Sequence, residues 1–142
     1  MTQSVYMTNL MGTGMPGAQA QLLANPMTTV MQPGEFFVES AADNIVACAG
    51  GGQTNATKLV NEMSRVTTVA TAGDSVALPL SAPGMSMLVM NAGANAMQVF
   101  GDLVGRGTIN GAPSNVGVSQ SAGSIVIYAC FSKGAWFVAG SL

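Results

Sequence analysis

Residues 124–131 read Ser-Ile-Val-Ile-Tyr-Ala-Cys-Phe, and this stretch decides the class of fold. Its β-branched and aromatic side chains favour a strand, and neither Pro nor Gly interrupts it. Neighbouring side chains of a strand point to opposite faces. Both faces are apolar here, with Ile125, Ile127, Ala129 and Phe131 on one and Val126, Tyr128 and Cys130 on the other. The sequence therefore predicts a strand whose outer face is covered too, by an arm of the chain or by another subunit.

Similar short runs between Gly, Pro and Asn turns fill the rest of the chain from Gly34 onward. The predicted strands, of which we expect around eight to form, are 35–39, 44–48, 66–71, 75–80, 85–90, 97–100, 108–110, 116–119, 124–131 and 135–139. Asn110-Gly111 is typical of a two-residue hairpin turn, in which both residues need positive φ, and Ser132-Lys133-Gly134 is expected to close the last hairpin. The pattern predicts an all-β fold, a jelly-roll-like antiparallel sandwich over residues 34–142.

One segment of the sandwich has the spacing of a helix instead. Between Asn55 and Arg65 the apolar residues fall at i, i+3, i+4 and i+7, and Thr54 or Asn55 is a suitable N-cap. These apolar residues are Ala56, Leu59, Val60 and Met63. We expect one short helix here, after a flexible Gly50-Gly51-Gly52 loop.

A weak internal repeat runs along the chain. Thr28-Thr29-Val30 with Gly34-Glu35 recurs as Thr67-Thr68-Val69 with Gly73-Asp74, and Val118 with Gly123-Ser124 is a looser copy. Each copy predicts a strand, a tight turn and a second strand. The spacing is irregular, whereas a solenoid shows a fixed period of about 20–50 residues. The expected architecture is therefore a sandwich and not a solenoid.

Residues 1–33 are predicted to be an extended N-terminal arm. This segment holds six of the 11 methionines, and Gly and Pro divide it into pieces too short for a stable helix. Disorder normally requires charge and low hydrophobicity, so an uncharged, Met-rich arm is expected to lie on a partner. The predicted partner-binding residues are Met7, Leu10, Met11, Met15, Leu22, Leu23 and Met27.

The composition excludes several classes of function. Charged residues make up 7% of the chain, against about 25% in an ordinary soluble domain, and the net charge is -2. The first basic residue is Lys58, so we expect neither nucleic-acid binding nor a cleaved targeting segment, and we place the chain in the cytoplasm where it is synthesised. Pro, Gly and Asn interrupt every long uncharged stretch, which argues against a membrane span.

Catalytic and cofactor-binding residues are scarce. The chain has no His, and its six carboxylates are dispersed; Glu35 and Glu39 lie about 13 Å apart on a strand, beyond the separation of a glycosidase pair. Gly12-Thr13-Gly14-Met15-Pro16-Gly17 matches a dinucleotide-binding pattern, but no βαβ alternation follows it. We therefore expect no enzyme, cofactor or metal site, and we expect two buried thiols at Cys48 and Cys130 in place of a disulfide.

Several stretches of the chain resemble capsid cement (decoration) proteins of tailed bacteriophages. The stretches are Arg65–Pro79 (RVTTVATAGDSVALP), Asn91–Gly101 (NAGANAMQVFG), Ile109-Asn110-Gly111 and the closing Trp136-Phe137. They span about half of the chain. The resemblance implies a jelly-roll-like β fold on the outer surface of an icosahedral head, where it clamps neighbouring subunits of the major capsid protein. It implies a virion location after synthesis in the host bacterial cytoplasm, and it brings no catalytic residues.

Alternatives remain open for both function and assembly. A receptor- or glycan-binding fibre or tail module would use the same sandwich, and exposed Tyr128 and Trp136 beside Asn or Asp would favour it. A head-completion protein would differ in copy number. The chain is expected to pair with itself, as a homodimer first because two-fold closure is commonest, and as a homotrimer second.

Overall fold

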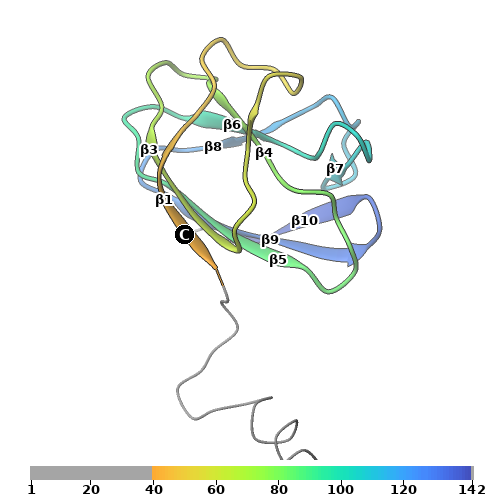
Figure 1. The fold of residues 1–142 in the computed structure, drawn as a ribbon. Coiled ribbons are helices and arrows are strands. Elements are labelled where there is room, and N and C mark those ends of the chain that lie inside the picture. The colour runs from red at the N-terminus through yellow and green to blue at the C-terminus, as the bar shows by residue number, and fades with distance from the viewer. Residues whose placement is uncertain (1–39, 142) are drawn as a thin grey trace, which may run out of the picture. The chain divides into compact units, whose positions relative to one another are not determined.

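The structure is a computed structural model that describes residues 40–141, which form ten strands in two sheets (Figure 1). The strands are β1 (Ala41–Val46), β2 (Thr57–Lys58), β3 (Met63–Thr68), β4 (Ser75–Ala77), β5 (Ser86–Asn91), β6 (Met97–Phe100), β7 (Thr108–Ile109), β8 (Val118–Gln120), β9 (Ile125–Ser132) and β10 (Ala135–Ser141). One sheet has the order β1-β3-β5-β9-β10-β7 and the other the order β2-β4-β6-β8. The prediction of an all-β fold is confirmed, while the predicted arm lies outside the described residues.

The first six strands form three stacked coils. Each coil contributes one strand to each sheet, so β1, β3 and β5 pair in parallel in one sheet and β2, β4 and β6 pair in parallel in the other. Successive partners in the first sheet are Ala41, Met63 and Leu88, which lie 22 and 25 residues apart. In the second sheet the partners Thr57, Val76 and Val99 lie 19 and 23 residues apart. This arrangement is that of a short β-solenoid.

The last strands close the stack in the opposite direction. β8 pairs antiparallel with β6, and β9 pairs antiparallel with β5 and with β10, so the fourth layer runs backwards along the third. β7 runs parallel to β10. Together with the four pairs within the coils, this makes five of the eight strand pairs parallel. The expectation of an antiparallel jelly roll is therefore wrong. Most connections cross to the opposite sheet and do not turn back as a hairpin, which produces parallel neighbours.

The expectation that the fold is not a solenoid is also wrong, because the coils stack in parallel. The second and third copies of the weak repeat do form a strand, a turn and a strand: β3 and β4 flank Gly73-Asp74, and β8 and β9 flank Gly123-Ser124. The coil length varies between 19 and 25 residues because the connections differ in length. That variation hides the period in the sequence.

The predicted helix between Asn55 and Arg65 does not form, and no helix occurs in residues 40–141. The segment supplies β2 and the start of β3, which pair with β4 and with β1 and β5. The four apolar residues do not share a face, since Ala56 and Leu59 are buried whereas Val60 is 78% and Met63 is 37% exposed. Long-range strand pairing has overridden the local helical spacing.

The hydrophobic core lies between the two sheets. Val76, Val99 and Val118 are cross-strand partners on β4, β6 and β8, and all three pack into this core. From the six-stranded sheet, the largest fully buried side chains are Tyr128 and Trp136, on neighbouring strands β9 and β10. Apolar cross-strand contacts of this kind are the unit of stability in a sheet.

Amide side chains, one half-buried at Asn95 and one buried at Asn91, hold the turns of successive coils together. Nδ2 of Asn95 donates to the carbonyl oxygens of Val69 and Ala70, both at 2.9 Å, in the turn of the preceding coil. Nδ2 of Asn91 donates to the carbonyl oxygen of Gln120 at 3.0 Å, in the following layer. Since a buried polar group is costly when unpaired, these bonds fix the stacking of one turn on the next.

The turn predictions are confirmed in part. Ser132-Lys133-Gly134 joins β9 to β10 as expected, and Gly134 has a φ of 82°. Asn110 and Gly111 both have positive φ, 53° and 75°, but they do not form a hairpin, because β7 before them pairs in parallel with β10 and not with the segment directly after the turn. The dipeptide therefore predicted the backbone conformation of the turn, but not which strands the flanking segments pair with.

Candidate interaction surfaces

The outer face of the six-stranded sheet is predominantly apolar. The outward side chains follow from the strand register: Met63 pairs with Leu88, which pairs with Ile127, and Arg65 pairs with Met90, which pairs with Ile125. On β9 the alternation is complete, because Val126, Tyr128 and Cys130 are buried while Ile127 and Phe131 are exposed. The prediction of a strand with two apolar faces is confirmed, and its outer face is open within the described residues.

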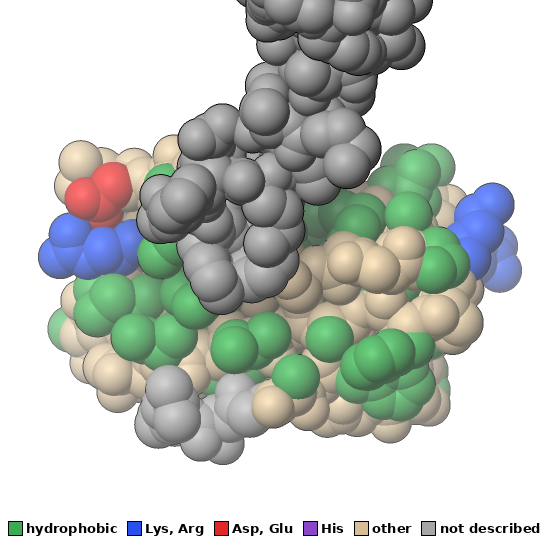
Figure 2. All heavy atoms as spheres, turned by 90° about the horizontal axis from the view of Figure 1, so that it is seen from below, with side chains coloured by type: hydrophobic (Ala, Val, Ile, Leu, Met, Phe, Trp, Pro, Cys, Tyr) green, Lys and Arg blue, Asp and Glu red, His purple; other side chains and the backbone are tan. Residues whose placement is uncertain are grey.

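Phe131 and Phe137 are exposed neighbours on this face. Phe131 is 75% and Phe137 is 40% exposed, and their ring centroids lie 6.1 Å apart. Trp136, next to Phe137 in the sequence, is fully buried, as expected because adjacent residues of a strand point to opposite faces. Figure 2 shows patches of hydrophobic side chains, separated by tan backbone and uncharged polar atoms, over the visible part of this face, with charged side chains toward its margins.

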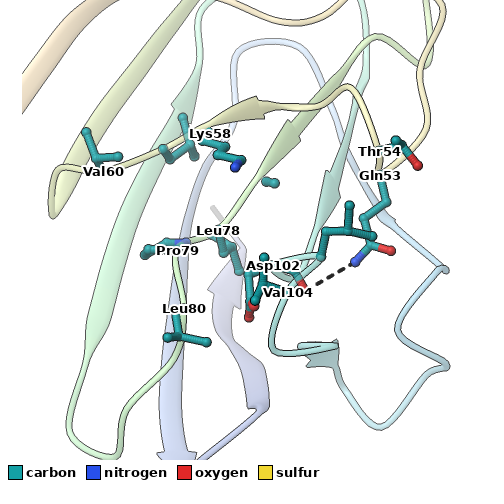
Figure 3. Close-up of a pocket in the computed structure, with 12 residues that line it drawn as sticks. Gln53, Thr54, Lys58, Val60, Leu78, Pro79, Leu80, Asp102 and Val104 are labelled. Carbon is teal, nitrogen blue, oxygen red and sulfur yellow. Dashed lines mark hydrogen bonds between the residues drawn. The ribbon is translucent and has the colours of Figure 1, made fainter.

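A second apolar surface surrounds a pocket at the carboxyl ends of β2, β4 and β6. The pocket has a volume of about 280 Å³. Its rim carries some of the most exposed apolar side chains of the described residues, namely Val60, Leu80, Leu103 and Val104. Figure 3 shows Leu78 and Pro79 between Val60 and Lys58 on one side and Leu80 on the other. The pocket residues all lie in loops or in the four-stranded sheet, so this surface is distinct from the outer face described above.

Asp102 lies in the wall of the pocket and is 8% exposed. Its Oδ2 accepts a hydrogen bond from the backbone N–H of Gly105, and Nε2 of Gln53 reaches its backbone carbonyl at 3.4 Å (Figure 3). Its Oδ1 is buried without a hydrogen-bond partner. Lys58 is the basic residue in the pocket wall, but the two side chains do not form an ion pair.

The partner-binding residues predicted from the sequence lie outside the described residues. This holds for Met7, Leu10, Met11, Met15, Leu22, Leu23 and Met27. The G-x-G-x-x-G pattern and the Glu35 and Glu39 carboxylates also fall there. The sequence reasoning missed the pocket, because its rim comes from three separate loops and the coil stacking that joins them was not foreseen.

Carboxylates and thiols do not gather into a reactive site in residues 40–141. His, Cys, Asp and Glu form no group of three that could hold a metal ion there. Both cysteines are free thiols, and Cys130 is buried as predicted, whereas Cys48 is only half-buried. Asp74 serves the fold, since it accepts hydrogen bonds from the backbone and hydroxyl of Thr71, both at 3.0 Å. No helix in this part of the chain is long and apolar enough to cross a membrane.

Comparison of the chain with protein-family models, with curated proteins and with solved structures finds no match.

Proposed function

We propose that this chain is a structural virion protein that binds the outer surface of a tailed-phage capsid and cements neighbouring major capsid subunits. The observation that carries the proposal is the apolar outer face of the six-stranded sheet, with Ile127, Phe131 and Phe137 exposed, because such a face favours an assembled state in which another subunit covers it. Large exposed apolar patches are typical of interaction sites, and with 7% charged residues the chain has little electrostatic means to stay apart from other molecules. The resemblance of residues 65–137 to capsid cement proteins supports the same role.

The segment proposed to contact the capsid is residues 1–33, through its Met and Leu side chains. Each contact can be weak, because binding through linked copies multiplies affinity by effective concentration. We expect capsid binding to depend little on salt, since few ionised groups are available to be screened.

The copy number in purified virions tests this proposal directly. Antibody labelling and quantitative gel analysis of particles are expected to give on the order of hundreds of copies, because decoration follows the repeated capsid lattice. A few tens or fewer would contradict decoration and favour a fibre or head-completion role. No labelling would remove the virion role altogether.

The contact segment is tested by co-sedimentation with phage heads that lack this protein. Changing Met7, Leu10 and Met11 together to Ser is expected to weaken binding strongly, while the matched changes Thr8→Ser and Asn9→Ser leave it intact. Unchanged binding by the triple variant would refute the role of these residues. A steep loss of wild-type binding between low and moderate salt would show that charge, and not apolar contact, dominates.

The alternative of a receptor- or glycan-binding fibre module would have been favoured by exposed Tyr128 and Trp136, and the structure does not show them exposed. Tyr128 and Trp136 are both fully buried, so neither aromatic ring can stack on a sugar. Phe131 and Phe137 are exposed, but both lie within the broad apolar sheet face.

A further inference from the structure

The pocket at the carboxyl ends of β2, β4 and β6 has a floor that belongs to the core. Leu59 and Leu78 line this pocket, and both side chains are fully buried. Their backbone N–H groups donate to the carbonyl oxygens of Ala77 and Phe100, both at 2.8 Å, in the next coil. These bonds fix the floor in place, so the pocket is formed before any ligand arrives, as is usual for small-molecule sites.

The pocket has room for a short aliphatic chain. An engineered apolar cavity of about 150 Å³ holds benzene, which has six carbon atoms. The volume of this pocket is about 280 Å³, so a chain of about eight carbon atoms fits on the same scale. The exposed side chains of Leu80, Leu103 and Val104 lie around the opening, where they add apolar contacts to such a chain.

The pocket also carries one ammonium group. Lys58 is exposed in the pocket wall and makes no ion pair within the described residues, where Asp43 is the partner of Arg65. In Figure 3 the side chain of Lys58 extends from β2 toward the other lining residues, with its nitrogen in blue. An anionic head group on a ligand would therefore find its counter-charge at Lys58.

The carboxylate of Asp102 does not offer a competing site for a cation, because it is turned into its own loop. Its Oδ2 accepts the hydrogen bond from the N–H of Gly105, and its Oδ1 is buried. A Cβ on Gly107 would lie 2.7 Å from Oδ1, so this oxygen lies against the backbone of a residue that does not line the pocket. The charge that the pocket presents to a ligand is therefore positive.

We propose that this pocket binds a straight-chain aliphatic carboxylate of about eight carbon atoms. The chain lies on Leu59 and Leu78, and the carboxylate lies at the opening beside the ammonium of Lys58. Burial of the chain supplies most of the binding free energy, and the ion pair selects an anionic head group over a cationic one. This site lies on a different surface from the apolar sheet face and does not depend on the proposed function.

Methyl NMR spectra of the full-length chain, labelled at Leu, Ile and Val, test the proposal. Titration with octanoate should shift the methyl signals of Leu59, Leu78 and Val104, while the signals of Ile127 report nonspecific binding to the sheet face. Each CH₂ added between butanoate and octanoate should tighten binding about threefold. Octylammonium has the same chain and should bind at least about threefold more weakly than octanoate.

Two pairs of variants separate the role of the charge from that of the chain. Lys58→Gln should weaken octanoate binding at least about threefold and remove the preference over octylammonium, whereas Lys133→Gln, in the turn between β9 and β10, should change neither. Leu80→Asp puts a like charge on the rim and should weaken octanoate binding at least about tenfold, and Val116→Asp, outside the pocket, is its control. All four residues are exposed, so the variants are expected to fold.

Three results would each overturn the proposal: octylammonium binding as tightly as octanoate, an affinity that does not change with chain length, or the absence of shifts at the pocket. A peptide with leucine next to aspartate presents the same chemistry on a protein partner. Tighter binding of this peptide than of octanoate would overturn the assignment to a free carboxylate. Because no phage heads are used, none of these results decides the proposed function.

Discussion

The hydroxyl of Tyr128 donates a hydrogen bond to Oε1 of Gln120 over 3.1 Å, and both side chains are buried. The amide nitrogen of the same Gln120 donates to the carbonyl oxygens of Val89, at 2.8 Å, and Ser124, at 3.2 Å. One amide therefore joins the end of β8 to β5, to β9 and to the turn before β9. This bond network lies where the direction of the stack reverses.

Removing the Tyr128 hydroxyl should destabilise the fold. Tyr128→Phe leaves Oε1 of Gln120 buried without a donor, which costs about 1–3 kcal/mol of unfolding free energy. Urea unfolding followed by circular dichroism measures the loss. Phe137→Tyr is the control, because it adds a hydroxyl to an exposed ring and should change stability by less than about 0.5 kcal/mol. An unchanged midpoint for Tyr128→Phe would show that water satisfies Gln120.

The ionisation of Tyr128 should be displaced to strongly alkaline pH. Burial raises the pKa of this phenol well above its usual value near 10, because the phenolate would lose its hydration. The unfolded chain releases this proton first, so the stability contributed by neutral Tyr128 is complete below about pH 10 and declines as the pH rises further.

The ultraviolet absorbance of phenolate measures this titration. The difference between wild type and Tyr128→Phe isolates Tyr128 from Tyr6, the other tyrosine. We expect the difference to appear together with loss of structure. A Tyr128 signal near pH 10 in the folded protein would contradict its burial.

Protonation of Asp74 at acid pH should lower the free energy of unfolding. The backbone N–H of Thr71 lowers the pKa of this carboxyl most, opposed by burial and assisted by the Thr71 hydroxyl and the N–H of Gly50. A lowered pKa means that the unfolded chain takes up the proton first. The contribution of Asp74 is therefore complete above about pH 4 and is lost as the pH falls through its folded pKa.

Urea midpoints at about pH 6 and about pH 3 test this effect. Asp74→Asn should lower the midpoint at the higher pH and reduce the difference between the two conditions. Asp43→Asn is the control, since its partner Arg65 is exposed and a surface ion pair contributes little. Equal acid sensitivity of wild type and Asp74→Asn would assign the effect to other carboxylates.

Gly101 should tolerate no side chain. A Cβ on this residue would collide with the backbone carbonyl of Gly107, which closes the loop after β6. Gly101→Ala is expected to cost about 3 kcal/mol or more, because backbone must move to admit the methyl group. Gly111→Ala is the comparison: its φ of 75° is strained for alanine, but no atom lies within 4 Å, so about 1–2 kcal/mol is expected. Equal losses would show that the Gly101 loop adapts.

The sequence predicts strands and turns well where the signal is local. The alternation in residues 124–131 gave β9 and both of its faces, and β6 has the predicted bounds 97–100. The two positive φ values at Asn110 and Gly111 were predicted correctly for the same reason, because the preference of this dipeptide for such a turn is local.

Strand partners could not be predicted in the same way. Whether Thr68 leads through a turn to an antiparallel neighbour or to the opposite sheet depends on contacts with residues far along the chain, such as the bond from Asn95 to Val69, which spans 26 positions. The helical spacing of residues 55–65 failed for that reason. The pocket was equally hidden, because Val60, Leu80 and Val104 meet only once three coils have stacked.

The parallel coils also bear on how such a chain can change length. β3 with β4 and β5 with β6 occupy equivalent positions and pair with their neighbours in the same direction, so duplicating or deleting one unit would preserve every type of contact at the junctions. The backward-running β8 and β9 offer no such equivalence. Gene duplication could lengthen this molecule from within its parallel coils, but not by repeating β8 and β9.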